Sequence, residues 1–155
     1  MMGGTSGLEH LNELYESIIM DHYRNPRHTD LIDSPDVDVQ ANNPFCGDEI
    51  HIQLGIDDDE LARVSVSGRG CAISQSSASL LSELINGKSR EEAHELVNLI
   101  RRMMKGEDLS EEEQDELGDA VALEGVKRFP VRVKCALLSW VALDDSLEDF
   151  EKKLA

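Results

Sequence analysis

The sequence predicts an α+β protein in which helices pack on a small, three-stranded antiparallel sheet. Three observations lead to this prediction. Short strand-like segments with polar turns lie in the first half of the chain, and helical periodicity with capping signals fills the second half. The length of 155 residues is that of about one domain, and no low-complexity linker divides the chain. We therefore expect one sheet and one helical layer around a single core.

The first predicted element is a helix from Leu8 to Arg24. Its apolar residues recur at helical spacing, and Asn25-Pro26 forbids its continuation. The preceding residues, 1–7, lack the basic residues and apolar core of a signal peptide and are predicted to be a disordered leader. Residues 8–155 are then expected to form the single domain.

Three strands are predicted to follow the first helix. The sheet is expected to be antiparallel because a polar turn, Asp57-Asp58-Asp59, joins the last two strands. This acidic turn lacks the glycine and the distal glutamate of an EF-hand, so we interpret it as solvated rather than calcium-binding. The strands are expected at Val37–Gln40, Glu49–Ile56 and Leu61–Ser67.

Helices are predicted from Ser74 onward. The first ends at Asn86-Gly87, and serines followed three residues later by glutamate open the next two at Ser89 and Ser110. The segment Lys105–Gly125 is acidic and prone to form helix. A last pair of helices is expected, one from about Pro130 to Leu143 and a short one that opens at Ser146.

The overall charge limits the classes of partner. Asp and Glu number 32 against 15 Lys and Arg, which gives a formal net charge of −17. Such a charge argues against nucleic acid and against an anionic membrane as partners, and no apolar run is long enough to span a bilayer. The acidic surface fits either a basic protein partner or a solvated exterior. The three widely spaced cysteines fit reduced thiols in a cytoplasmic protein better than a disulfide framework.

The cysteines and one aspartate are the strongest functional signal. Cys46, Cys71 and Cys135 are all the cysteines in the chain, and with Asp48 they offer three sulfur atoms and one oxygen. This donor set matches one tetrahedral zinc ion. Because the residues are far apart in sequence, only the fold can bring them together.

Each cysteine has neighbours that favour an exposed or ionised thiol. Cys46 and Asp48 lie in a Pro- and Gly-containing turn between two predicted strands. Cys71 follows a glycine and precedes a helix, where the helix dipole lowers the pKa of a thiol. Cys135 follows Arg132 and Lys134, which are expected to favour its ionised form. Arg69, Arg132 and Lys134 are candidates to compensate the negative charge of such a site.

Other interpretations of these residues remain. A single cysteine is more often an inert core residue than a reactive one. A cysteine–histidine nucleophilic pair is the rival chemistry, although no histidine lies in a motif that favours it. His22 and His94 follow helical stripes and are expected to pack between helices or lie on the surface. The histidines available for such a pair are His10, His22, His28, His51 and His94.

Four motifs together resemble the IscU-like iron–sulfur cluster assembly proteins, and specifically their SufU branch. The resemblance covers about Leu14 to Leu143. In the scaffold branch a histidine typically precedes the last cysteine, whereas this chain has Lys134, and the acidic segment 105–125 resembles the SufU insertion. The motifs are Asp21-His22-Tyr23-Arg24-Asn25-Pro26-Arg27, Asn43-Pro44-Phe45-Cys46-Gly47-Asp48, Gly70-Cys71-Ala72-Ile73-Ser74 and Arg132-Val133-Lys134-Cys135-Ala136-Leu137-Leu138.

The resemblance implies a zinc site formed by Cys46, Asp48, Cys71 and Cys135. It also implies a sulfurtransferase function, in which Cys46 accepts persulfide sulfur from a SufS-type cysteine desulfurase and passes it to the SufBCD assembly complex. Arg132 would steer the acceptor loop or the sulfur. The alternative is a scaffold on which the same cysteines bind iron or a transient 2Fe–2S cluster. A third class is a structural zinc module that only binds partners.

Overall fold

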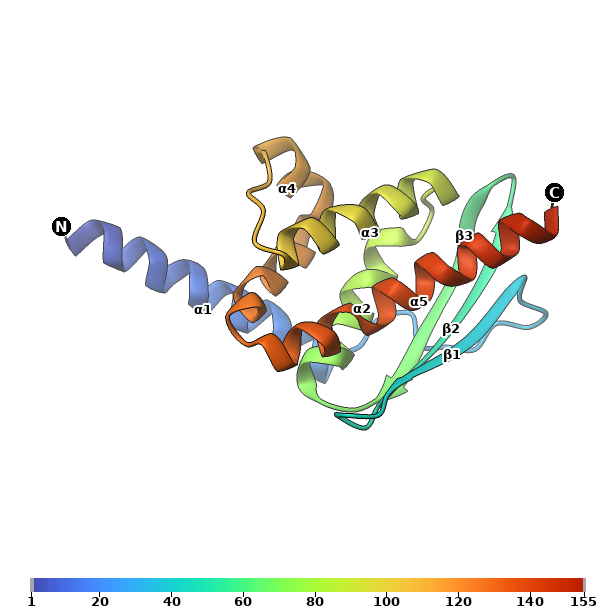
Figure 1. Cartoon of the computed structure of the whole chain (residues 1–155), viewed down its shortest axis with the longest axis horizontal. Helices are drawn as coiled ribbons and strands as arrows, with labels where there is room; N and C mark the ends of the chain where they lie inside the picture. The colour runs from blue at the N-terminus through green and yellow to red at the C-terminus, as the bar shows by residue number, and fades with distance from the viewer. Residues whose placement is uncertain (1, 155) are drawn as a thin grey trace.

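The computed structural model describes the backbone of residues 2–154 and the side chains from residue 11 to residue 154. A long helix comes first, a three-stranded sheet second and the remaining helices third, as Figure 1 shows. The α+β class predicted from the sequence is confirmed. The elements are α1 (Met2–Arg24), β1 (Val37–Asn43), β2 (Asp48–Asp57), β3 (Glu60–Arg69), α2 (Ala72–Ile85), α3 (Arg90–Met104), α4 (Glu111–Leu117), the 3-10 helix η1 (Gly118–Arg128) and α5 (Pro130–Leu154).

The sheet has the strand order β1-β2-β3, and both pairs are antiparallel, as predicted. Alternate residues of the central strand, Ile50, Ile52 and Leu54, are fully buried because side chains of a strand point alternately to its two faces. The strands extend further than predicted. β1 reaches Asn43 and pairs it with Asp48 of β2, so that the motif between them forms a tight hairpin at one end of the sheet.

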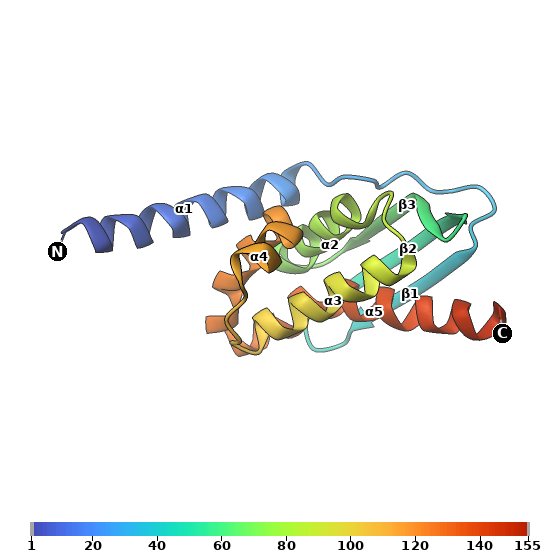
Figure 2. The ribbon, with the colours of Figure 1, turned by 90° about the horizontal axis from the view of Figure 1, so that it is seen from above.

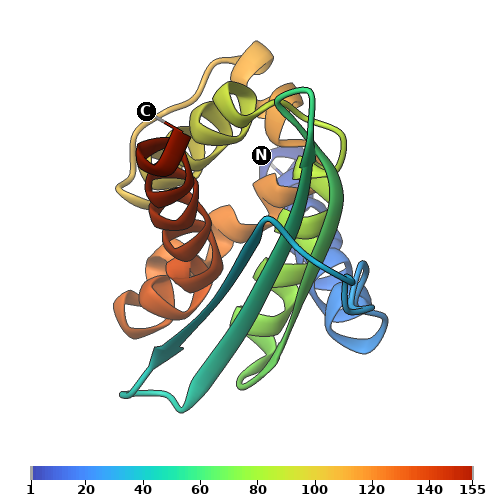
Figure 3. The same ribbon diagram turned by 90° about the vertical axis from the view of Figure 1, so that its right-hand side faces the viewer.

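The helical layer packs on the sheet through α2 and α5, and α5 runs alongside β1 (Figure 3). Trp140 of α5 is fully buried, and its indole N–H donates to Ser77 Oγ of α2 at 2.8 Å. Ser77 in turn donates to the carbonyl of Ala136 at 2.5 Å. These bonds fix the first half of α5 against α2, and with it the position of Cys135.

The prediction of two C-terminal helices was wrong, because α5 is one helix of 25 residues. Ser146 is not an N-cap. Its hydroxyl donates to the carbonyl of Leu143 within the helix at 2.8 Å, and Leu143 and Leu147 continue one buried stripe across the expected break. No glycine or proline interrupts this segment, so the helix has no reason to end.

The first helix also begins earlier than expected. α1 starts at Met2, so residues 2–7, expected to be a disordered leader, are helical, while Met1 lies outside the described residues. Figure 2 shows its first half extending away from the body of the molecule. No helix between residues 2 and 154 has the length and apolar character needed to cross a membrane.

The capping signals at Ser89 and Ser110 predict their helices correctly. Each serine side chain accepts a hydrogen bond from the third following backbone N–H, and the glutamate there bonds back to the serine N–H. The acidic segment 105–125 forms α4 and most of η1, both helical as its composition suggests. This segment leads directly into the start of α5, where Cys135 lies.

Candidate metal centre

The hairpin between β1 and β2 presents the first two candidate ligands. The carbonyl of Asn43 accepts hydrogen bonds from the N–H groups of Cys46 at 3.2 Å and Gly47 at 2.9 Å. Gly47 has a φ of +69°, a conformation that glycine adopts at little cost. The turn leaves Cys46 half-buried, while Asp48, at the start of β2, is fully buried.

Asp48 is tied to the segment that carries Cys71. Its Oδ1 accepts a hydrogen bond from the Cys71 N–H at 2.9 Å. The residue before Cys71 is Gly70, with a φ of +148°, and a Cβ atom there would collide with the Asp48 carboxylate. Only glycine therefore allows the end of β3 to approach Asp48 so closely. Cys71 is the N-cap of α2, and its Sγ accepts from the Ser74 N–H at 3.5 Å.

Cys135 completes a compact group from the second turn of α5. Its Sγ lies 3.1 Å from the Sγ of Cys46. One ligand atom from each of Cys46, Asp48 and Cys135 lies within 4.8 Å of the other two, a spacing that one metal ion can bridge. Asn43 faces the same group, with its Nδ2 3.9 Å from the Cys135 Sγ.

Cys71 lies at the edge of this group. Its Sγ is 4.0 Å from Asp48 Oδ2, so Cys71 is next to the one ligand of the compact group that is a carboxylate. The fold thus brings the three thiols near the Asp48 carboxylate, with Cys46 and Cys135 in the compact group and Cys71 beside it.

The electrostatics of Cys135 differ from the sequence-based expectation. Burial raises the pKa of the Cys135 thiol, and hydrogen bonds with Cys46 and Asp48 act in the same direction. The expected effect of Arg132 on the thiol is present but is outweighed in the protein without metal, because the Cys135 side chain is 0 % exposed and lies among other acidic groups. A divalent cation is the kind of neighbour that reverses this balance.

Arg132 lies beside the thiols. A hydrogen bond with Cys135 raises the pKa of the Arg132 guanidinium, and electrostatic interactions with Cys71, Cys135 and Cys46 act in the same direction. The side chain is exposed. It is therefore a cation placed at the mouth of the site rather than in its interior.

The accessible side of Cys46 is lined by exposed apolar residues. A hollow of about 680 Å³ opens there, lined by Cys46, Arg128, Pro130, Arg132 and three apolar residues. Phe45 is 83 % exposed, Val131 69 % and Phe129 56 %. The Lys134 ammonium lies 5.4 Å from the centre of the Phe45 ring, so Lys134 contacts the Cys46 loop from outside the thiol group.

The described histidines take no part in the thiol group, which disfavours a cysteine–histidine pair. His22 bonds to Ser79 Oγ at 2.8 Å, His51 to Asp38 at 2.6 Å and His94 to Asp144 at 2.6 Å. His22 and His94 pack between helices, as expected, whereas the side chain of His10 lies outside the described residues.

Two features of the site were not assigned a role from the sequence. Gly70 is required by the close approach of Asp48, and a glycine directly before a candidate ligand was the available signal. The exposure of Phe45 had no such signal, because a phenylalanine between Pro44 and Cys46 is equally compatible with a buried position.

The comparisons with known proteins agree with the fold and the motifs. The sequence profile of the NifU-like N terminal domain matches residues 14–153. Over 134 residues the chain is 42% identical to the zinc-dependent sulfurtransferase SufU of Bacillus subtilis, covering 86% of this chain and 89% of that protein. It is 38% identical over 141 residues to the iron–sulfur cluster assembly scaffold protein IscU of Streptococcus pyogenes, covering 91% and 87% respectively.

Solved structures show the same similarity. The crystal structure of FiSufU from Fervidobacterium islandicum, described as an iron–sulfur cluster assembly scaffold protein for the SUF system, aligns with a TM-score of 0.80 at 33% identity. The alignment covers 87% of this chain and 97% of that one. The predicted three-stranded sheet with helices packed on it is therefore also the fold of that protein.

Proposed function

The chain belongs to the family of NifU-like N-terminal domains, to which SufU- and IscU-type iron–sulfur cluster assembly proteins belong, and we propose that it is a zinc-dependent sulfur acceptor that receives sulfur on Cys46. One observation carries the proposal. Of the two thiols in the compact group, Cys135 is fully buried, whereas Cys46 lies on a hairpin and lines an open hollow. Of these two thiols, Cys46 is the one that another protein can reach without unfolding α5, and the half-buried Cys71 lies outside the compact group and does not line this hollow.

The side chains present fit a zinc ion. Cys46, Asp48 and Cys135 supply two sulfurs and one oxygen within 4.8 Å of one another, and Cys71 adds a third sulfur beside Asp48. Three Cys and one carboxylate are zinc-type ligands, and a buried group of acidic donors is stable as a set of anions only with a cation among them. When bound, zinc would keep the thiols deprotonated and hold the Cys46 loop, β2 and α5 together.

The proposed reaction is thiol–persulfide exchange. The Cys46 thiolate attacks the outer sulfur of a persulfide on the donor enzyme, a new S–S bond forms at Cys46, the donor S–S bond breaks and the donor leaves as a thiolate. Atoms and electrons balance without an external oxidant. The Arg132 guanidinium, at the mouth of the site, stabilises the anionic sulfur as it arrives.

The proposed partners follow from the same family. The sulfur donor would be a SufS-type cysteine desulfurase and the recipient a SufBCD-type complex in the cytoplasm. The similarity to a protein named as a zinc-dependent sulfurtransferase supports this assignment. So does the position of Lys134, which contacts Phe45 instead of supplying a fourth cluster ligand.

The test is alanine production by the desulfurase with the zinc-loaded protein and a weak thiol recycler. The wild type should raise turnover and become labelled with sulfur on Cys46, whereas Cys46→Ala should do neither. Cys46→Ala must keep its far-ultraviolet circular dichroism for the comparison to be valid. If Cys46→Ala raises turnover as the wild type does, Cys46 is not the acceptor.

The second candidate function is a cluster scaffold, which the similarity to IscU of Streptococcus pyogenes favours. The same three cysteines would then hold a 2Fe–2S cluster. Incubation with ferrous iron, cysteine and the desulfurase under anaerobic conditions distinguishes the two functions. A visible absorption spectrum that persists after gel filtration indicates a scaffold, whereas retained zinc and a persulfide on Cys46 indicate a sulfur acceptor.

A further inference from the structure

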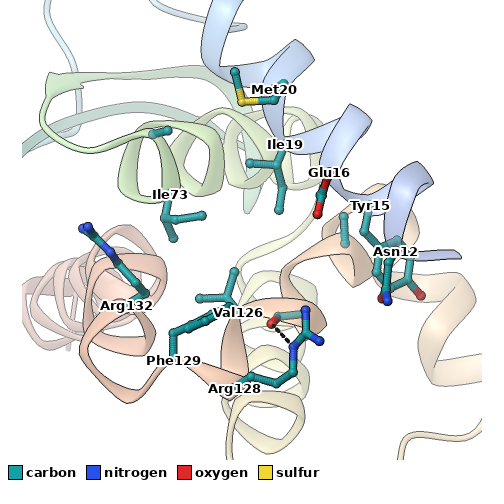
Figure 4. Close-up of a pocket in the computed structure, with 13 residues that line it drawn as sticks. Asn12, Tyr15, Glu16, Ile19, Met20, Ile73, Val126, Arg128, Phe129 and Arg132 are labelled. Carbon is teal, nitrogen blue, oxygen red and sulfur yellow. Dashed lines mark hydrogen bonds between the residues drawn. The ribbon is translucent and has the colours of Figure 1, made fainter. Parts of the chain in front are cut away.

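A second hollow lies on the other side of the start of α5, and we call it the α1–α5 groove. It measures about 310 Å³ and is formed by α1, the first turn of α2, η1 and the start of α5. Ile19, Ile73 and Val126 converge on it from three different elements, as Figure 4 shows. Its walls are mainly apolar, although it opens to solvent.

Two large apolar side chains at the groove are exposed to solvent. Met20 is 36 % exposed and Phe129 56 %, although both are large apolar side chains. An apolar hollow rimmed by charged groups is typical of a binding site for an apolar side chain of a partner. The structure therefore leaves apolar area at this position that another molecule could cover.

The two sides of the groove carry opposite charges. Glu16 lies on the α1 side, and Arg128 and Arg132 lie on the η1 and α5 side. Arg132 is engaged with the thiols. Among the described residues Arg128 forms no ion pair: it donates to the carbonyl of Gly125 at 3.3 Å, and its guanidinium lies 5.6 Å from the centre of the Phe129 ring. In a chain with a net charge of −17, an unpaired arginine here favours an acidic residue of a partner.

The groove is continuous with the hollow at Cys46. Both are lined by Arg128, Phe129 and Arg132, so the start of α5 forms a ridge with Cys46 on one side and the groove on the other. A segment bound in the groove is therefore held next to the acceptor thiol. Cys46 is the thiol proposed to accept sulfur, so the partner that lies beside this hollow at that step is the sulfur donor.

We propose that the α1–α5 groove binds an apolar segment of the sulfur-donating desulfurase, with an acidic residue of that segment paired to Arg128. The proposal rests on the proposed function, because it takes the desulfurase as the partner. It adds a docking site that is separate from the thiols, and so separates binding of the partner from transfer of sulfur.

The test uses two matched variants on α1 in the zinc-loaded protein. Met20→Glu places a carboxylate in the groove, and Leu14→Glu makes the same change at an apolar residue that is 54 % exposed but does not line the groove. Calorimetric titration with the desulfurase should show a dissociation constant raised about tenfold or more for Met20→Glu and within about twofold of wild type for Leu14→Glu.

Two variants of Arg128 give an independent measurement at an exposed position. Arg128→Glu should weaken binding of the desulfurase to a similar degree, and Arg128→Lys, which keeps the positive charge, should weaken it much less. Lys153→Glu, near the end of α5, is the control for charge reversal and should leave the affinity unchanged. Zinc content and thermal unfolding are measured for every variant. If Met20→Glu proves unstable, the Arg128 pair decides the question.

The outcomes separate this inference from the proposed function. If the wild type binds the desulfurase and both Met20→Glu and Arg128→Glu bind equally well, the groove is not the docking site, although Cys46 can still be the acceptor. If the wild type does not bind the desulfurase, the proposed function fails and the groove inference fails with it.

Discussion

The two ends of α5 carry two clusters of titratable groups that differ in how their charges are balanced. Near its start, Cys135 meets Cys46 and Asp48, three acidic groups with Arg132 at the mouth. In its second half, Asp144 and Glu151 both bond to His94 of α3, at 2.6 Å and 3.1 Å. Both clusters hold α5 against its neighbours, but only one is complete without a further partner.

In the cluster around His94, each charged side chain has an oppositely charged partner from the same chain. Arg90 lies 3.2 Å from Glu151, Arg101 lies 3.6 Å from Asp144, and Arg90 also pairs with Asp59. Three cations thus face three carboxylates when His94 is protonated. Such a balanced network serves stability, whereas a buried group of acidic donors with an unbalanced charge is suited to bind a cation. The unbalanced cluster is therefore where chemistry is expected.

The largest expected effect is that of Asp48→Ala on the unbalanced cluster. The change removes a candidate ligand and leaves the Cys71 N–H without its partner, which alone costs about 1–3 kcal/mol. We expect the zinc content measured by atomic absorption to fall strongly and the transition temperature to fall by at least about 5 °C. Asp38→Ala, at an exposed carboxylate on β1, is the control and should keep its zinc. Full zinc occupancy in Asp48→Ala would show that Asp48 is not a ligand.

The next effect is that of Gly70→Ala, which leaves every candidate ligand in place. The added methyl group collides with the Asp48 carboxylate, and φ at this position is unfavourable for alanine. We expect a loss of about 2 kcal/mol in the free energy of unfolding and weaker zinc binding in a competition with a chelator. Gly125→Ala, where the added carbon meets open space, should bind zinc as the wild type does. Equal zinc affinities for the two variants would contradict the required approach of Gly70 to Asp48.

The sequence predicted the sheet, the capped helices and the four candidate ligands because each has a local signal. Ser89 and Ser110 carry their capping boxes, and the polar turn Asp57-Asp58-Asp59 marks the connection between the last two strands. The continuity of α5 through Ser146 could not be predicted, since serine followed by acidic residues is also typical of a helix start. The raised pKa of Cys135 could not be predicted, because burial depends on packing between α5 and the hairpin, which local charge patterns do not report.

A mutation in the cluster around His94 should change the free energy of unfolding but not zinc binding, and the change should depend on pH. Burial lowers the pKa of His94, but the hydrogen bonds with Asp144 and Glu151 outweigh it and raise the pKa above its usual value. Because the folded pKa is the higher one, this contribution is complete below the unfolded pKa of about 6.5 and is lost as the pH rises through the folded pKa. His94→Gln should therefore cost about 1 kcal/mol at pH 5.5 and less at pH 9, as measured by urea unfolding.

His51→Gln removes an imidazole from an exposed pair with Asp38 and controls for the loss of a histidine elsewhere. Zinc content should not change in either histidine variant, since neither side chain belongs to the thiol group. If His94→Gln lowered the free energy of unfolding by the same amount at pH 5.5 and at pH 9, the result would contradict the raised pKa of His94. Loss of zinc in His94→Gln would instead mean that the two ends of α5 are coupled.

The smallest expected effect concerns the loop that carries Cys46. The Lys134 ammonium over the Phe45 ring links this loop to α5, and at such an exposed position the contact contributes about 0.5 kcal/mol. Phe45→Leu keeps an apolar side chain but removes the ring face, so the loop should open more often. In metal-free protein the alkylation rate of Cys46, followed by peptide mass spectrometry, should rise about twofold.

Phe129→Leu is the matched control for this last change. Phe129 is exposed, lies near an arginine at 5.6 Å and lines the same hollow, but it is not on the Cys46 hairpin. Its replacement should leave the alkylation rate of Cys46 unchanged. Equal rates in the two variants would mean that the loop is held by its own backbone bonds to Asn43 and by the contact between the two thiols, and that the Lys134–Phe45 contact adds nothing to it.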